Sequence, residues 1–140
     1  MRVVPDTNTV VSGLLWRGAP YRLLLSAHRE CIGLFISRPM FEELARVLQR
    51  PKFAAIFKKA GLTPHAVMAE FSALTHWVEP ASIPPVIRED PSDDHVLACA
   101  FAANAEAIVS GDRHLLEIGA YKKIPILTAP ALLLRLESQS

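Results

Sequence analysis

The sequence is poor in cysteine and lacks the cysteine and histidine spacings that mark zinc sites. Its two cysteines, Cys31 and Cys99, each lie inside an apolar stretch, so we expect buried, reduced thiols. Neither a Cys-x-x-Cys nor a His-x-x-x-His spacing occurs in the chain, and these are usual signatures of zinc binding. The sequence therefore gives no indication of a zinc site.

Long apolar runs are also missing. The longest uninterrupted one extends from Val96 to Ala103, far short of the ~20 residues that cross a bilayer. At the amino terminus, Asp6 falls where the apolar segment of a signal peptide would be building. We therefore expect a cytoplasmic protein with no membrane segment.

The chain has no excess of charge of either sign. Its 15 basic and 14 acidic residues nearly cancel, so the overall charge does not point to a nucleic acid partner, and any such binding must come from local asymmetry. Of the 140 residues, 51% are hydrophobic and 21% are charged. These values are typical of one soluble globular domain with a substantial core.

Short apolar segments alternate with segments of helical character. Strands are expected at residues 2–4, 32–37, 76–79, 107–109 and 125–127. Helices are expected at 20–28, 39–50, 52–60, 64–74, 93–104, 114–118 and 129–136, after a helical region at 10–11 that Gly13 and Gly18 interrupt. Residues 81–89 are expected to form a loop. This alternation predicts an α/β fold, with a central parallel sheet of about five strands flanked by helices.

Acidic residues follow two of these strands and open one of these helices. Asp6 and Asp112 come just after apolar runs, and Asp93 and Asp94 begin a helix that is apolar almost all round. Because the carboxyl ends of parallel strands share one edge of the sheet, carboxylates far apart in the sequence can meet there. Several carboxylates in one cleft repel one another unless protons or a divalent cation neutralise them. The pattern therefore suits magnesium or manganese chemistry on a phosphate backbone.

Each acid also has a structural alternative. Aspartates often cap helix amino termini or form turns, and this could explain Asp6, Asp93, Asp94 and Asp112. Asp90 is a competing cap for the helix at 93–104. Pro5 is awkward in a central strand because it removes a ladder N–H, so the first strand ends at Val4 or position 5 lacks a ladder partner.

A further pair of acids, Glu42 and Glu43, lies on the polar side of the helix at 39–50. Phe41, Leu44 and Leu48 form its apolar stripe, and at about 100° per residue both glutamates face away from it. Periodicity leaves the choice between them open, and a solvated surface pair is the simplest interpretation.

Four motifs combine these acids with their neighbours: Val3-Val4-Pro5-Asp6-Thr7-Asn8, Phe41-Glu42-Glu43-Leu44, Asp93-Asp94-His95-Val96-Leu97-Ala98-Cys99-Ala100 and Ile108-Val109-Ser110-Gly111-Asp112. Together they resemble the motifs of PIN-domain nucleases, in that family's order and over essentially the whole chain. Two more stretches, Leu15-Trp16-Arg17-Gly18 and Arg50-Pro51-Lys52-Phe53, resemble the branch of toxins from prokaryotic toxin–antitoxin pairs related to VapC. The resemblance implies a single PIN domain over residues 1–140.

The same resemblance implies a site. The metal-binding and catalytic carboxylates would be Asp6, Glu43, Asp94 and Asp112. Glu43 is preferred because it directly precedes an apolar helical position, and Asp94 because Asp-x-x-Leu-Ala-x-Ala matches the family's spacing. Supporting polar residues would be Asn8, Asp93 and Ser110, the last standing where threonine is usual. Pro5 stands where the family usually has an aliphatic residue.

The implied activity is hydrolysis of RNA phosphodiester bonds, assisted by Mg²⁺ or Mn²⁺, by the toxin of a toxin–antitoxin system. All-oxygen ligation favours these hard ions over zinc. The implied partners are the RNA substrate, a cognate antitoxin protein and a second copy in a homodimer.

One local charge asymmetry bears on RNA binding. No acid occurs between Glu43 and Glu70, a stretch that carries five basic residues with two phenylalanines among them. Such a segment could guide a phosphate backbone, or it could be an ordinary solvated helix face with its phenylalanines in the core. The candidate RNA-binding residues are Arg17, Arg46, Arg50 and Lys52.

Other classes fit less well. A phosphatase of the haloacid-dehalogenase type needs a second aspartate two residues after the first, and that position holds Asn8. The remaining alternative is a PIN-fold binding or regulatory protein with weak or no nuclease activity.

Overall fold

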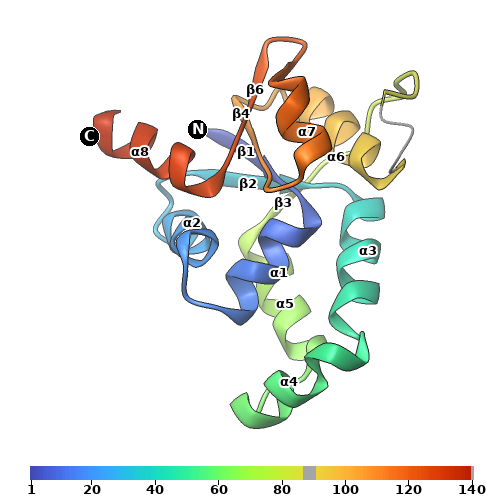
Figure 1. Cartoon of the computed structure of the whole chain (residues 1–140), viewed down its shortest axis with the longest axis vertical. Helices are drawn as coiled ribbons and strands as arrows, with labels where there is room; N and C mark the ends of the chain where they lie inside the picture. Colours follow the sequence, from blue (N-terminus) through green and yellow to red (C-terminus); the bar gives the residue numbers. More distant parts are fainter. Residues whose placement is uncertain (87–90, 140) are drawn as a thin grey trace.

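The computed structural model describes residues 1–86 and 91–139 of the chain. Within them, six strands form one sheet in the order β3-β2-β1-β4-β6-β5 (Figure 1). The strands are β1 Arg2–Pro5, β2 Gly33–Ile36, β3 His76–Trp77, β4 Ala107–Val109, β5 Ala120–Tyr121 and β6 Ile124–Leu127. All neighbours are parallel except β5 and β6. The predicted α/β fold with a parallel sheet is therefore confirmed, and β5 is an addition to it.

Helices pack around this sheet and against each other. They are α1 Thr7–Leu15, α2 Ala19–His28, α3 Arg38–Leu48, the 3₁₀ helix η1 Pro51–Phe53, α4 Ala54–Ala60, α5 Pro64–Leu74, α6 Pro91–Ala102, α7 Arg113–Ile118 and α8 Ala129–Gln139. Helix α6 packs on β1, β2 and β4, while α1 packs against α2 and α3, and α2 against α8. In Figure 1, α4 lies at the end of the molecule farthest from β6. None of the described helices is long and apolar enough to cross a membrane.

The core explains why the central strands are apolar on both faces. Val3 and Val4 of β1 and Ile108 and Val109 of β4 are completely buried, as expected for parallel strands covered by helices on both sides. Burying such side chains gives ~1.5–3 kcal/mol each. The two strands therefore form a firm base for the residues that follow them.

Pro5 is the last residue of β1, so the strand does not end at Val4. It pairs with Val109 of β4, whose carbonyl accepts the N–H of Asp6 at 2.9 Å. On the β2 side, the register places the Phe35 carbonyl where an N–H of residue 5 would donate, and proline has none. The thiol of Cys99 donates to that carbonyl at 3.8 Å instead. Burial raises the pKa of this thiol to about 12, so the donor proton is retained.

Three details differ from the sequence-based expectations. Gly13 does not interrupt a helix but lies inside α1, close to α2. Cys31 is exposed, so the expectation of two buried thiols holds for Cys99 only. The helix at 39–50 ends at Leu48, before Pro51. Residues 81–86 form no helix or strand, as expected, whereas the rest of the predicted loop and Asp90 lie outside the described residues.

Candidate active site

A small acidic cavity lies at the carboxyl edge of β1 and β4. Its volume is about 50 Å³, enough for a few water molecules. The described residues that line it are Asp6, Thr7, Asn8, Glu43, Asp93, Val96 and Asp112. Four separate segments of the chain thus bring carboxylates to one place, as the sheet-edge argument predicts.

Asp6 is the most deeply buried of these acids, with 4% of its surface exposed. One carboxylate oxygen accepts the N–H of Thr9 at 2.9 Å and so caps α1. The other accepts the hydroxyl of Ser110 at 2.5 Å. Burial raises the pKa of Asp6 above its usual value, the hydrogen bonds from Ser110 and Thr9 oppose this, and the charge of Asp112 adds to it. Ionisation of Asp6 in this buried place is therefore energetically unfavourable, and a bound cation would offset that free-energy cost.

Asp112 caps α7 and reaches the same cavity. One of its carboxylate oxygens, Oδ1, accepts the N–H groups of His114 at 2.7 Å and Leu115 at 3.3 Å. Its own N–H donates to the Ser110 hydroxyl at 2.8 Å. Ser110 thus connects Asp6 to Asp112, and capping occupies only one oxygen of Asp112 in the described contacts. The structural and the chemical interpretations of this acid are compatible.

Glu43 enters the cavity from α3. Its carboxylate accepts the hydroxyl of Thr7 at 2.8 Å, a contact between α1 and α3. Glu42 is exposed at the surface, so the fold separates two glutamates that periodicity could not. Thr7 is a residue that the sequence-based site missed. Its position in the sequence could have indicated this role, because Thr7 carries a hydroxyl directly after Asp6, in the first turn of a helix that starts at the sheet edge.

The structure places the two acids of α6 differently from the prediction. Asp93, expected as a supporting residue, is 6% exposed and lines the cavity. Asp94, expected as a metal ligand, is not among the described lining residues, and its carboxylate accepts the N–H of Val86 at 3.2 Å. Consecutive helical residues point about 100° apart, so the side chains of Asp93 and Asp94 are directed differently. The geometry favours Asp93.

The donor set of this cavity fits a hard divalent cation, since its charged groups are all carboxylates and its other polar groups are a hydroxyl and an amide. Within the described part of the chain, no three acidic, histidine or cysteine side chains lie in an arrangement that could hold a metal ion as they stand. Three of the four carboxylates are instead held by Ser110, Thr7 and helix amides. Small side-chain rotations toward a cation are thus required before it could be bound.

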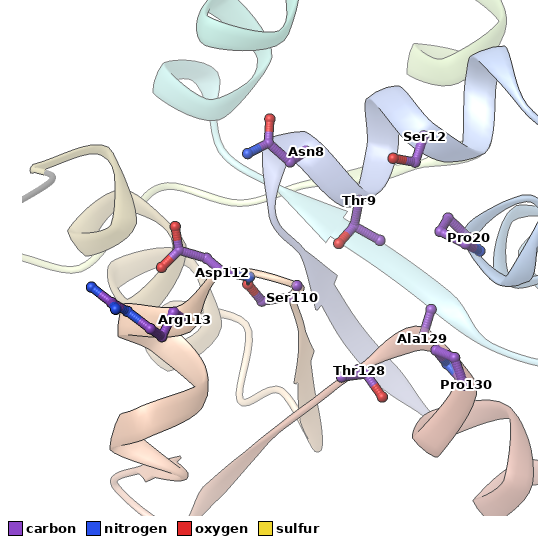
Figure 2. Close-up of a pocket in the computed structure, with 11 residues that line it drawn as sticks. Asn8, Thr9, Ser12, Pro20, Ser110, Asp112, Arg113, Thr128, Ala129 and Pro130 are labelled. Carbon is purple, nitrogen blue, oxygen red and sulfur yellow. Dashed lines mark hydrogen bonds between the residues drawn. The ribbon is translucent and has the colours of Figure 1, made fainter.

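A wider cavity of about 480 Å³ adjoins the acidic one, and both share Asn8 and Asp112 (Figure 2). Hydroxyl groups dominate its polar lining. Its residues are Asn8, Thr9, Ser12, Pro20, Ser110, Gly111, Asp112, Arg113, Thr128, Ala129 and Pro130. They come from α1, the start of α2, the β4–α7 turn and the start of α8 (Figure 2). The cavity is large enough for a nucleoside-sized ligand.

The predicted RNA-binding residues lie elsewhere. Arg17, Arg46, Arg50 and Lys52 are all described and exposed, and none of them lines either cavity. Arg46 follows Glu43 by three positions on α3 and so lies on the same side of that helix, while Arg50 lies beyond the end of α3, just before η1. Basic side chains therefore follow Glu43 along the chain as it runs away from the acidic cavity.

Comparisons with known proteins agree with this architecture. The sequence model of the PIN domain family matches residues 2–114. A chain in the crystal structure of VapBC2 from Rickettsia felis, bound to a DNA fragment from their promoter, superposes with a TM-score of 0.61. That match has 16% sequence identity and covers 90% of this chain and 97% of the other, so the likeness is one of fold. No curated protein matches the sequence.

Proposed function

The chain belongs to the PIN domain family, and from this premise we propose that it is a metal-dependent endoribonuclease and the toxin of a toxin–antitoxin pair. The observation that carries the proposal is the cavity at the sheet edge, which Asp6, Glu43, Asp93 and Asp112 line together. The domain is proposed to span residues 1–140, because α8 packs against α2 as part of the same body.

In the proposed site, Mg²⁺ or Mn²⁺ is held by Asp6, Glu43, Asp93 and Asp112, and Asp93 takes the role that the family resemblance implied for Asp94. When bound, the cation would orient water for attack on the phosphate and stabilise the charge that develops there. Asp94 instead holds the backbone at Val86. This exchange of roles is the main change to the sequence-based site.

The protein's own groups supply positioning. The Ser110 hydroxyl fixes Asp6 and the backbone of Asp112 relative to each other. The Thr7 hydroxyl fixes Glu43. Asn8 lies where the two cavities meet, and its amide can bond a phosphate oxygen or a sugar hydroxyl of a strand that passes from one to the other. These contacts would align the scissile bond with the acidic cavity.

Single-stranded RNA is the proposed substrate, with Arg17, Arg46, Arg50 and Lys52 guiding its phosphates. The proposed partners are a small antitoxin protein and a second copy of the chain. The antitoxin partner is supported by the similarity in fold to a chain of VapBC2 from Rickettsia felis.

The activity is tested by incubating labelled single-stranded RNA with purified protein, free of any partner, and Mg²⁺ or Mn²⁺. We expect internal cleavage that EDTA abolishes and that Asp112→Asn lowers by at least roughly 100-fold. Asparagine retains the capacity to cap α7, so this variant should fold. Glu43→Gln should lose activity, whereas Glu42→Gln, at the exposed neighbouring position, serves as the matched control and should retain it.

Two results would contradict the proposal. Equal cleavage by Asp112→Asn and wild type would remove the active-site assignment. No cleavage of any RNA by the metal-loaded protein would favour the alternative, a PIN-fold binding or regulatory protein without nuclease activity.

A further inference from the structure

An exposed tryptophan lies at the end of α1 opposite the acidic cavity. Trp16 is the residue that ends this helix, and 50% of its surface is exposed. Its ring meets that of Phe53 edge to face, with centroids 6.2 Å apart and planes at 65°. Phe53 of η1 is 6% exposed, so it supports the indole from the core side. The indole is therefore held in place while half of it faces solvent.

Cationic side chains belong to the same two segments as this indole and its supporting ring. The ammonium of Lys52 lies 5.1 Å from the centre of the Phe53 ring. Arg17 follows Trp16 directly, and its guanidinium lies 4.9 Å from the centre of the Tyr21 ring and donates to the Tyr21 hydroxyl at 3.2 Å. The two segments that build this cluster, residues 7–29 and 44–69, contain no aspartate or glutamate. An anionic ligand meets no like charge from either segment.

Two helices connect the cluster to the acidic cavity. Asp6 caps the start of α1 and Trp16 caps its end, a separation of about 15 Å at 1.5 Å per residue. Beside it, the chain runs from Glu43 past Arg46 and Arg50 to Lys52 and Phe53. Basic side chains thus lie along the path between the acidic cavity and the indole.

We propose that Trp16 stacks on a base of the bound single-stranded RNA, at a fixed distance of a few nucleotides from the bond that is cut. The inference rests on the proposed nuclease function. An exposed aromatic ring flanked by cations suits a ligand that offers both π faces and phosphates, which is the chemistry of single-stranded nucleic acid. A separation of about 15 Å corresponds to roughly four nucleotides of stacked strand, at 3.4 Å each, and to fewer of an extended one.

Fluorescence tests the stacking without requiring cleavage. In a protein that carries Asp112→Asn and Trp77→Phe, Trp16 is the one remaining tryptophan. Titration with a 12-nucleotide oligouridylate should quench its emission in a saturable way. In the Asp112→Asn background, Trp16→Ala should weaken binding of the labelled oligonucleotide roughly 5- to 100-fold, whereas Trp16→Phe, which keeps an aromatic face, should retain most of it. Thermal unfolding of both variants shows that the fold is intact.

Abasic substrates test the distance in the active enzyme. A single abasic nucleotide moved along the RNA should slow cleavage at one offset from the cut, and Trp16→Ala should remove that sensitivity. If the wild-type protein cuts no RNA, the proposed function fails, while the fluorescence result still decides the stacking. Unchanged Trp16 emission at saturating oligonucleotide, or equal affinity of the Trp16→Ala variant, would overturn the inference and leave a protein partner as the ligand of this surface.

Discussion

At the scale of single residues, the acids of the cavity serve the fold and the chemistry together. Asp6 and Asp112 each cap a helix, and both contact Ser110. Carboxylates that cap helices stabilise them by ~1 kcal/mol. In the sequence, Asp6 and Asp112 therefore look like ordinary helix caps. What distinguishes them is that the sheet brings both caps to one edge, so their charges meet in a buried place.

Asp6 gives a prediction about stability. Burial raises its pKa in the folded protein, so the folded state binds the proton more tightly than the unfolded state, and stability falls as pH rises from the unfolded value of 3.8 through the folded one. Without divalent cations, Asp6→Asn should therefore be more stable than wild type at pH 7, and the two should converge below pH 3.8.

Urea unfolding of both proteins at several pH values in EDTA measures this difference. The matched control is Glu42→Gln, which neutralises an exposed acid and should leave stability nearly unchanged. A constant difference between Asp6→Asn and wild type across the whole pH range would show that the effect does not come from ionisation of Asp6.

The residue scale also shows what the sequence could and could not predict of the site. Resemblance to the family's spacing favoured Asp94 as the metal ligand, whereas Asp93 is the one of the two that lines the cavity. The family resemblance favoured Glu43 over Glu42 as a site residue. In the structure, Glu43 lines the cavity and accepts a hydrogen bond from Thr7. The direction of one side chain among neighbours depends on how its helix packs, and a local pattern does not contain that information.

At the scale of elements, close packing explains a glycine that the sequence placed between helices. A Cβ on Gly13 would lie 2.8 Å from Leu24 Cδ1 and 2.9 Å from the Pro20 carbonyl oxygen. The second contact is with backbone and cannot be relieved by a side-chain rotation. The absence of a side chain thus allows α1 and α2 to approach closely.

Gly13→Ala tests this account because two effects oppose each other. Helix propensity alone would stabilise α1 by about 1 kcal/mol, whereas overpacking costs ~1–3 kcal/mol. We expect a net loss in the free energy of unfolding, measured with urea. Ser12→Ala, one position earlier and half-buried, is the control and should change stability little. A gain in stability for Gly13→Ala would contradict the close approach of α1 and α2.

The missed strand β5 has a similar explanation. It pairs with β6 through a turn in which Lys122 and Lys123 both have positive φ, of 47° and 69°. Two-residue hairpin turns of this kind usually contain asparagine and glycine. A pair of lysines gives no such indication, so this strand could not be predicted from the sequence, whereas the fully apolar segments of β1 and β4 could.

At the scale of the whole molecule, the fold serves to gather four distant acids. Asp6 and Asp112 follow parallel neighbours in the sheet, while α3 and α6 contribute Glu43 and Asp93. Strand–helix alternation made this general layout predictable, because parallel strands must share a carboxyl edge. The wider cavity and the Trp16 surface depend on how helices meet, and they became visible only in the folded structure.

The central claim is that the acidic cavity binds a divalent cation through Asp6, Glu43, Asp93 and Asp112. Calorimetric titration of the wild-type protein with Mn²⁺, alongside Asp93→Asn and Asp94→Asn, tests it most directly. These two substitutions remove the same charge at neighbouring positions, of which only Asp93 lines the cavity. We predict that Asp94→Asn binds Mn²⁺ like wild type, whereas Asp93→Asn loses at least roughly tenfold in affinity. Equal affinities in all three proteins, a loss confined to Asp94→Asn, or no binding by the wild type would contradict the account.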